Sequence, residues 1–208
     1  MKTKSKALLL SLCAVLLVVA SVMGTMAYLT SSDTVTNTFT VSKVEIKLDE
    51  TDVTNPTGPR VQANSYRLLP GLTYIKDPTV TVKAGSEPSY VKMTVTFTKA
   101  AELDAIFALN GGADMTSIFN GYDSTNWIDK GNTEDTDTNT RTYEFWYKET
   151  VDARTADVVL DALFDSITVP GSITKEQLKT IDGMTITVNA YAIQADGFTG
   201  AADAWSHF

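Results

Sequence analysis

The chain has 208 residues, with 25 acidic against 17 basic side chains and a formal net charge of −8 at neutral pH. This acidic balance argues against a nucleic-acid-binding protein, which needs a basic face. One histidine and one cysteine are too few for a disulfide framework, or for a zinc site built on His and Cys ligands.

The first 27 residues predict a secretory signal peptide. Three lysines within the first six residues precede an almost unbroken apolar run over 7–23, and small residues follow before a polar segment. We expect cleavage between Ala27 and Tyr28. The cut removes the three lysines and no acidic residue, so the formal charge falls from −8 to −11.

Two alternatives concern the same segment. The apolar run is nearly long enough to span a bilayer, so it would also fit an uncleaved anchor. Cys13 would suggest a lipoprotein signal, but Leu12 stands before it where such signals carry a small residue, and apolar residues continue after it. We therefore favour cleavage after Ala27, which leaves the mature chain without cysteine.

Residues 28–41, YLTSSDTVTNTFTV, predict an N-terminal arm that pairs as a donor strand. An extended segment can add to the open edge of another sheet, and head-to-tail addition builds filaments because it does not close. The alternatives are an arm that folds back on its own domain and one that stays disordered. We expect the assembly strand to use Tyr28, Leu29, Val35, Phe39 and Val41.

Residues 42–208 predict a β-sandwich domain. Short runs alternate apolar and polar residues between Gly- and Pro-rich turns, which indicates an all-β fold of two packed sheets. The parity of the apolar positions changes between Val41 and Val44, which predicts a β-bulge at residues 42–43. The expected strands lie at 44–48, 80–82, 91–97, 143–147, 164–170 and 184–190.

Two short helices are expected between the strands. In 171–183, Thr174 and Gln177 form the capping-box pattern that begins a helix. In 99–112, an apolar helical face precedes a glycine stop at Gly111. That face consists of Leu103, Ile106 and Phe107.

The polar stretch 131–140, GNTEDTDTNT, predicts a hairpin loop. The aromatic residues that follow alternate as strand side chains do, so core packing is favoured over a sugar-binding stripe. In this interpretation one face of the strand carries Tyr143, Phe145 and Tyr147, and the other carries Trp146.

The same loop contains the residues that could ligate a metal ion. Asp135, Asp137 and Asn139 are spaced like the first ligands of a calcium loop. Thr140 and Trp146 then stand where an EF-hand needs glycine and glutamate, so the EF-hand interpretation fails. A weak calcium site remains the alternative to a solvated loop.

The sequence gives no basis for a catalytic site. His207 is the single histidine and lies next to the end of the chain, and neither G-x-S-x-G nor H-E-x-x-H occurs. We therefore expect a protein that is not an enzyme, with no catalytic residues and no cofactor.

Four segments together resemble the TasA/camelysin family, which comprises exported biofilm-matrix fibre proteins of Gram-positive bacteria. They are MGTMAYLTSSDTVTNTFTVSKVEIKLDE (23–50), LLPGLTYIKDPTVTVKAGSEPSYVKM (68–93), ALFDSITVPGSITKEQL (162–178) and TITVNAYAIQADGF (185–198). The resemblance implies a jelly-roll-like sandwich with helical insertions. It also implies a signal read by a dedicated signal peptidase of the SipW type, and polymerisation in which the N-terminal strand of one subunit completes the next.

The resulting hypothesis is a secreted structural subunit of extracellular matrix fibres that pairs with itself, with an accessory or anchoring matrix protein as a further candidate partner. The first alternative is a monomeric surface adhesin or accessory matrix-binding module, with 131–140 and the 120–128 loop as its contact surface. The second is a metallopeptidase, a label that the family has also carried and that the missing ligands argue against.

Overall fold

Helix α1, Thr3–Tyr28, carries the N-terminal apolar run in the computed structural model, which describes residues 3–28, 42–108 and 118–208. The chain separates into two compact units, residues 1–41 and 42–208. Leucine and valine side chains between Leu8 and Val19 of α1 are exposed. Among the described residues, no helix combines the length and the apolar character that crossing a membrane requires.

One layer of the second unit is a four-stranded antiparallel sheet in the order β10-β4-β7-β6. Strand β4 lies inside the sheet, and its odd-numbered residues are buried from Ser89 to Phe97 while the even-numbered ones are half-buried. This confirms the alternation that the sequence predicted. The strands are β4 (Ser89–Thr98), β6 (Trp127–Asp135), β7 (Thr140–Tyr147) and β10 (Ile186–Gln194).

Two three-stranded antiparallel sheets, in the orders β1-β3-β8 and β2-β9-β5, supply the rest of the β-structure. The unit is therefore mostly β with short helices, which confirms the predicted all-β class, but it has three hydrogen-bonded sheets where two were predicted. The strands are β1 (Ile46–Asp49), β2 (Thr73–Ile75), β3 (Thr79–Val82), β5 (Phe119–Asn120), β8 (Val158–Val159) and β9 (Ser166–Thr168).

Backbone hydrogen bonds join these two small sheets into one layer. Leu160 N–H donates to Val80 O at 2.9 Å, Leu163 N–H to Pro78 O at 3.1 Å, and Lys76 N–H to Asp165 O at 3.0 Å. One residue separates the acceptors Pro78 and Val80, whereas two separate the donors Leu160 and Leu163, so the donor segment has one extra residue, as in a β-bulge. Pro78 has no N–H to donate, which accounts for the third sheet: it interrupts a continuous ladder.

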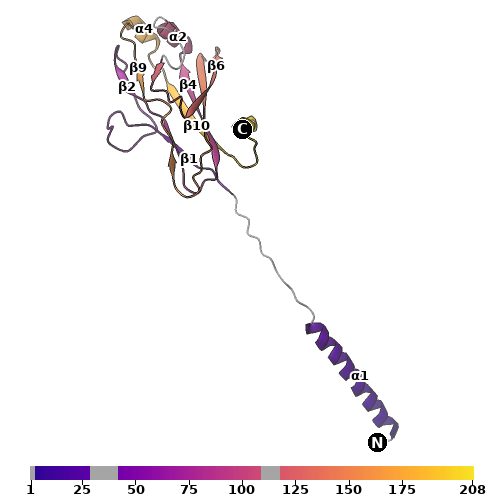
Figure 1. Ribbon diagram of the computed structural model, residues 1–208. Helices are drawn as coiled ribbons and strands as arrows, with labels where there is room; N and C mark the ends of the chain where they lie inside the picture. The colour runs from indigo at the N-terminus through magenta and orange to yellow at the C-terminus, as the bar shows by residue number, and fades with distance from the viewer. Residues whose placement is uncertain (1–2, 29–41, 109–117) are drawn as a thin grey trace. The chain divides into compact units, whose positions relative to one another are not determined.

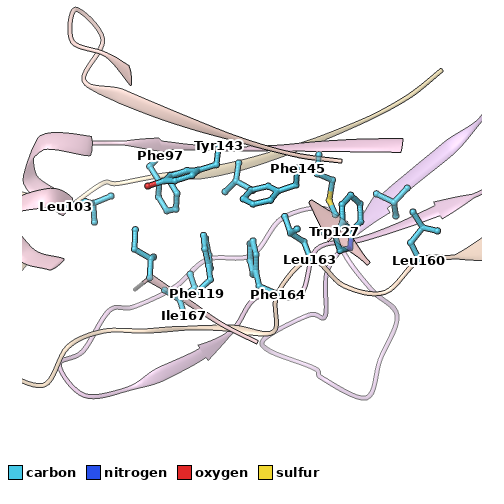
Figure 2. Packing of buried hydrophobic residues seen from close by; sticks show 14 of the residues in the cluster. Phe97, Leu103, Phe119, Trp127, Tyr143, Phe145, Leu160, Leu163, Phe164 and Ile167 are labelled. Atoms are coloured by element: carbon cyan, nitrogen blue, oxygen red, sulfur yellow. The ribbon is translucent and has the colours of Figure 1, made fainter. Parts of the chain in front are cut away.

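The core fills the space between the two layers (Figure 2). Phe97 and Tyr143 meet edge to face with ring centroids 5.9 Å apart, and Phe119 stacks on Phe164 at 3.7 Å from the opposite side. Tyr143 and Phe145 are buried, whereas Trp146 lies on the other face and contacts Trp205, 6.4 Å between ring centroids. Core packing, as predicted, accounts for the inward aromatic residues.

Helices α2, Ala100–Ala108, and α4, Lys175–Thr180, lie side by side at one end of the sandwich (Figure 1). Both were predicted. Thr174 and Gln177 form the complete capping box, and the apolar face of α2 is buried. The C-terminal helix α5, Ala201–Ser206, was not predicted, because it begins after Gly200 without the side-chain capping bond that marks the equally short α4.

The prediction of a loop at 131–140 is wrong for residues 131–135. Strand β6 continues to Asp135 as an exposed edge strand, and the turn occupies 136–139. A polar edge strand lacks the alternation that marks a half-buried one, which explains the error. Val44, Ile46 and Leu48 are half-buried on one face as expected. The bulge inferred from Val41 and the stop at Gly111 depend on positions outside the described residues.

Phe145→Ala should lower the free energy of unfolding by about 3–5 kcal/mol, since it removes a fully buried ring from the centre of the core. Ile128→Ala, on the exposed edge strand at 41% exposure, should change it by less than about 0.5 kcal/mol. Urea denaturation of residues 42–208 measures both. Equal losses would contradict the placement of the core between the layers.

Candidate functional site

An open groove of about 1110 Å³ lies on the side of the sandwich where β10 is the edge strand. One side is formed by residues 183–188, which lead into β10, and the other by the end of β1 and the segment 62–68. Small-molecule sites usually measure roughly 300–1,000 Å³. The groove lies near the upper end of that range.

The floor of the groove is apolar, whereas the lining around it also includes polar and charged side chains such as Arg67, Lys175 and Asp182. Its floor includes Phe97, Leu103 and Ile167, which Figure 2 shows at one end of the core. These three side chains are at most 7% exposed, and it is the half-buried side chains around them that leave the core incompletely covered on this side. Six half-buried side chains border the floor: Leu48, Leu68, Leu178, Met184, Ile186 and Val188.

The two edges of the four-stranded sheet differ in how they are protected. Strand β6 carries four charged residues and a β-bulge between Asp129 and Asn132. Charges and bulges of this kind keep an edge from pairing with another strand. Strand β10 carries no charged residue, and its register with β4 is unbroken from Ile186 to Gln194. Among the described residues, β10 therefore has a hydrogen-bonded partner strand on one side only, while β1 and α5 also contact it.

The segment 62–68 forms the facing wall and is extended without belonging to a sheet. Its even-numbered residues Asn64, Tyr66 and Leu68 are half-buried, and the odd ones between them are exposed. Within the described part of the chain, no backbone–backbone hydrogen bond involves residues 62–68. Both sides of the groove thus carry backbone groups that can accept a strand.

A guanidinium holds this wall in place. Arg60 Nε donates to Asp49 Oδ1 at 2.6 Å, and Nη1 donates to Asp77 Oδ2 at 2.8 Å and Thr51 Oγ1 at 3.1 Å. Nη2 donates to Thr79 Oγ1 at 2.8 Å and to the backbone oxygens of Asp77 and Asp49. We call these five residues the Arg60 clasp. It ties the loop that follows β1 to the junction between β2 and β3.

Burial alone would raise the pKa of Asp77 in the clasp. Hydrogen bonds from the backbone and hydroxyl of Thr51 and from Arg60 outweigh that effect and lower the pKa below its ordinary 3.8. The nearby Tyr66 shows the opposite result: burial, and secondarily the charge of Glu50, raise the pKa of its hydroxyl. Asp77 is therefore ionised and Tyr66 neutral at physiological pH.

A buried ion pair lies on the same wall. Lys76 Nζ is 2.5 Å from Glu50 Oε1, and the two side chains are only 5% and 11% exposed. Asn64 Nδ2 donates to Glu50 Oε2 at 3.3 Å and to Thr51 O at 2.9 Å. Glu50, Asn64 and Lys76 all line the groove, so its apolar surface contains one buried charged spot.

The structure places the predicted cleavage residues Ala27 and Tyr28 at the end of α1. Of the other assembly residues, Leu29, Val35, Phe39 and Val41 lie outside the described part of the chain.

The calcium candidates Asp135, Asp137 and Asn139 are not brought together around an ion. Asp135 Oδ1 accepts from the backbone of Asp137 at 3.0 Å, whereas Asn139 turns away to accept from Ala101 N–H at the start of α2. In the described ranges, no group of three or more His, Cys, Asp or Glu side chains could hold a metal. His207 Nδ1 lies 2.9 Å from Asp203 O within α5.

Sequence reasoning missed the clasp and the buried pair. Charged residues at the ends of short strands usually face solvent, and nothing in KLDE or IKDP distinguishes Glu50 and Lys76 as buried. The one usable signal is the Asp77–Pro78 pair, which marks an interruption between two strand patterns.

No family model, curated protein or solved structure matches the chain.

Arg60→Gln should speed amide hydrogen exchange at Glu50, Thr51 and Val61 by about tenfold or more. The three amides donate hydrogen bonds at the base of the loop after β1, which Arg60 closes. Hydrogen bonds to charged groups contribute about 1.5–3 kcal/mol each. Arg154→Gln is the control, because Arg154 lies on the surface and its side-chain hydrogen bonds go to Asp152. Unchanged exchange in Arg60→Gln would show that the clasp does not hold the wall.

Asp77→Asn should be most destabilising above pH 3.8. A carboxylate whose pKa is lower folded than unfolded stabilises the fold above the unfolded value of 3.8 and loses that contribution as the pH falls through the folded value. The difference in unfolding free energy between wild type and variant should therefore shrink in acid. Urea denaturation across pH tests this, with the exposed Asp196→Asn as reference. A difference that stays constant with pH would contradict it.

Proposed function

We propose that this protein is a secreted structural subunit of extracellular matrix fibres that assembles by strand donation. Residues 28–41 of one mature chain occupy the groove of the next, beside β10. The observation that carries the proposal is the groove itself: an apolar trough between an unprotected sheet edge and a second unpaired backbone segment.

The pattern of the arm fits the chemistry of the groove. In TVTNTFTV, residues 34–41, every even position is threonine, and the odd positions include Val35, Phe39 and Val41. On a strand the two sets face opposite sides. The odd side chains would therefore lie on the apolar floor, and the threonines would face outward.

Donation from one chain to the next supports a filament. The arm precedes the domain and the groove is on the domain, so the contact joins two different surfaces and repeats without closing. Backbone hydrogen bonds would supply affinity along β10, and the odd-numbered side chains would supply selectivity.

The resemblance to the TasA/camelysin family supports the same proposal and extends it. In this proposal the all-β unit is a jelly-roll-like sandwich, and a dedicated signal peptidase of the SipW type frees the arm by cutting between Ala27 and Tyr28. The product acts outside the cell, in the matrix or at the cell surface, with other copies of itself and an accessory or anchoring matrix protein as partners. It performs no catalysis.

Phe39→Asp in the mature chain, residues 28–208, should abolish fibres, because a carboxylate would have to enter the apolar groove without a partner. Thr40→Asp is the matched control: it adds the same charge one residue away, on the outward face, and should leave fibres intact. Negative-stain electron microscopy after incubation at several pH values compares both variants with wild type.

The chain without its arm, residues 42–208, should stay monomeric, and added peptide 28–41 should bind to it. Fibres from 42–208, or from Phe39→Asp, would contradict strand donation. Monomers from every variant, wild type included, would favour the monomeric adhesin or accessory module, and binding of a matrix polysaccharide would then be the property to measure.

A further inference from the structure

The charged side chains that line the groove fall into two groups. Those of the first group are neutralised by partners: Asp49 pairs with Arg60, and Glu50 pairs with Lys76. The second group consists of four exposed residues: Arg67, Lys175, Lys179 and Asp182. In the described ranges none of these four side chains belongs to an ion pair. Three positive charges against one negative make the groove locally cationic, on a chain whose formal net charge is −8.

Helix α4 contributes two of these cationic side chains together with an apolar one. Leu178 and Lys179 lie three and four residues after Lys175, so the three side chains share one face of the helix, and all of them line the groove. Leu178 is half-buried against the core, whereas both lysines are exposed. Lysine stems can lie along apolar surface while their ammonium groups remain in water. Positive charge therefore borders the apolar floor directly.

The floor itself consists of core side chains. Ile106 and Ile118 line it together with the side chains that Figure 2 shows at this end of the core, Phe97, Leu103 and Ile167. Sites for small molecules are mostly apolar with a few polar groups that orient the ligand, and they measure roughly 300–1,000 Å³. A groove of about 1110 Å³ with this lining fits an amphiphile that has one apolar chain and one anionic head group.

We propose that the groove binds a long-chain fatty acid. The acyl chain lies on the apolar floor, and the carboxylate lies at the rim beside Lys175 and Lys179, with Arg67 as a third cationic group. Charge complementarity selects the head group, because a cationic amphiphile of the same length gains the floor contacts but is repelled at the rim. The inference goes beyond the proposed function, since a chain whose groove holds no arm offers the same surface to a small ligand.

Equilibrium binding to residues 42–208, the unit that contains the whole buried core, tests the inference. The probe is a dansyl-labelled undecanoic acid, whose emission rises in an apolar site, and unlabelled ligands displace it below their critical micelle concentrations. These ligands are dodecanoate, the shorter decanoate, and dodecyltrimethylammonium, which combines the same chain with the opposite charge. The rim variant is Lys175→Gln with Lys179→Gln. Its matched control is Lys130→Gln with Arg154→Gln, which removes two exposed positive charges outside the groove.

Dodecanoate should displace the probe from a saturable site. Decanoate should bind about tenfold more weakly, because each buried methylene contributes about fourfold. Dodecyltrimethylammonium and the rim variant should each show a loss of about fivefold relative to dodecanoate on wild type, as expected for two exposed ion pairs. Added salt should weaken dodecanoate binding to wild type. The control variant should bind dodecanoate within about twofold of wild type. The comparison of the three ligands on wild type does not depend on any variant.

Absence of saturable displacement by dodecanoate would overturn the inference. Equal affinity for dodecanoate and dodecyltrimethylammonium would overturn it too, since the head group would then not be recognised. Binding of peptide 28–41 without binding of dodecanoate would reserve the groove for the arm, which rejects the fatty-acid site and leaves the proposed function standing. Binding of phosphatidylglycerol vesicles without binding of free dodecanoate would assign the rim to a membrane surface and would equally reject the site.

Discussion

The unpaired edge of β10, next to an incompletely covered core, is the constraint on which the rest of this structure depends. Apolar side chains along the groove are only half-buried, and in the described part of the chain residues 62–68 make no backbone–backbone hydrogen bond. Most soluble domains protect such an edge with charges or a bulge, as this one does on β6. Within the four-stranded sheet, charges and a bulge thus distinguish the β6 edge from the β10 edge.

The polar network around the groove serves geometry more than stability. The Arg60 clasp bonds the end of β1, the excursion after it and the β2–β3 junction through one guanidinium. It fixes the chain just before residues 62–68, which line the groove across from the start of β10. The Glu50–Lys76 pair places a buried ion pair beside the apolar floor, and burial of such a pair contributes little net stability.

The sequence pattern predicted those parts of the fold that are determined by residues close together in the chain. The alternation in β4 and the capping box of α4 were readable because each is set by side chains within a few residues. Strand β6 was missed because an exposed edge has no apolar face. The third sheet comes from one missing N–H at Pro78.

The groove itself was beyond sequence reasoning, since it is built by segments distant in the chain: the end of β1, residues 62–68 and the start of β10. The arm that the proposal places there was identified from sequence, by the expected cut and its alternation.

Hydrogen exchange in monomers and in fibres of the mature chain, compared residue by residue, tests the central claim most directly. Strand donation predicts new protection in the fibre at 62–68 and along 184–188, because an added strand pairs with those amides. The exposed edge β6 provides the internal reference and should exchange alike in both states. Protection that appears along β6 while the groove amides stay unchanged would contradict the account.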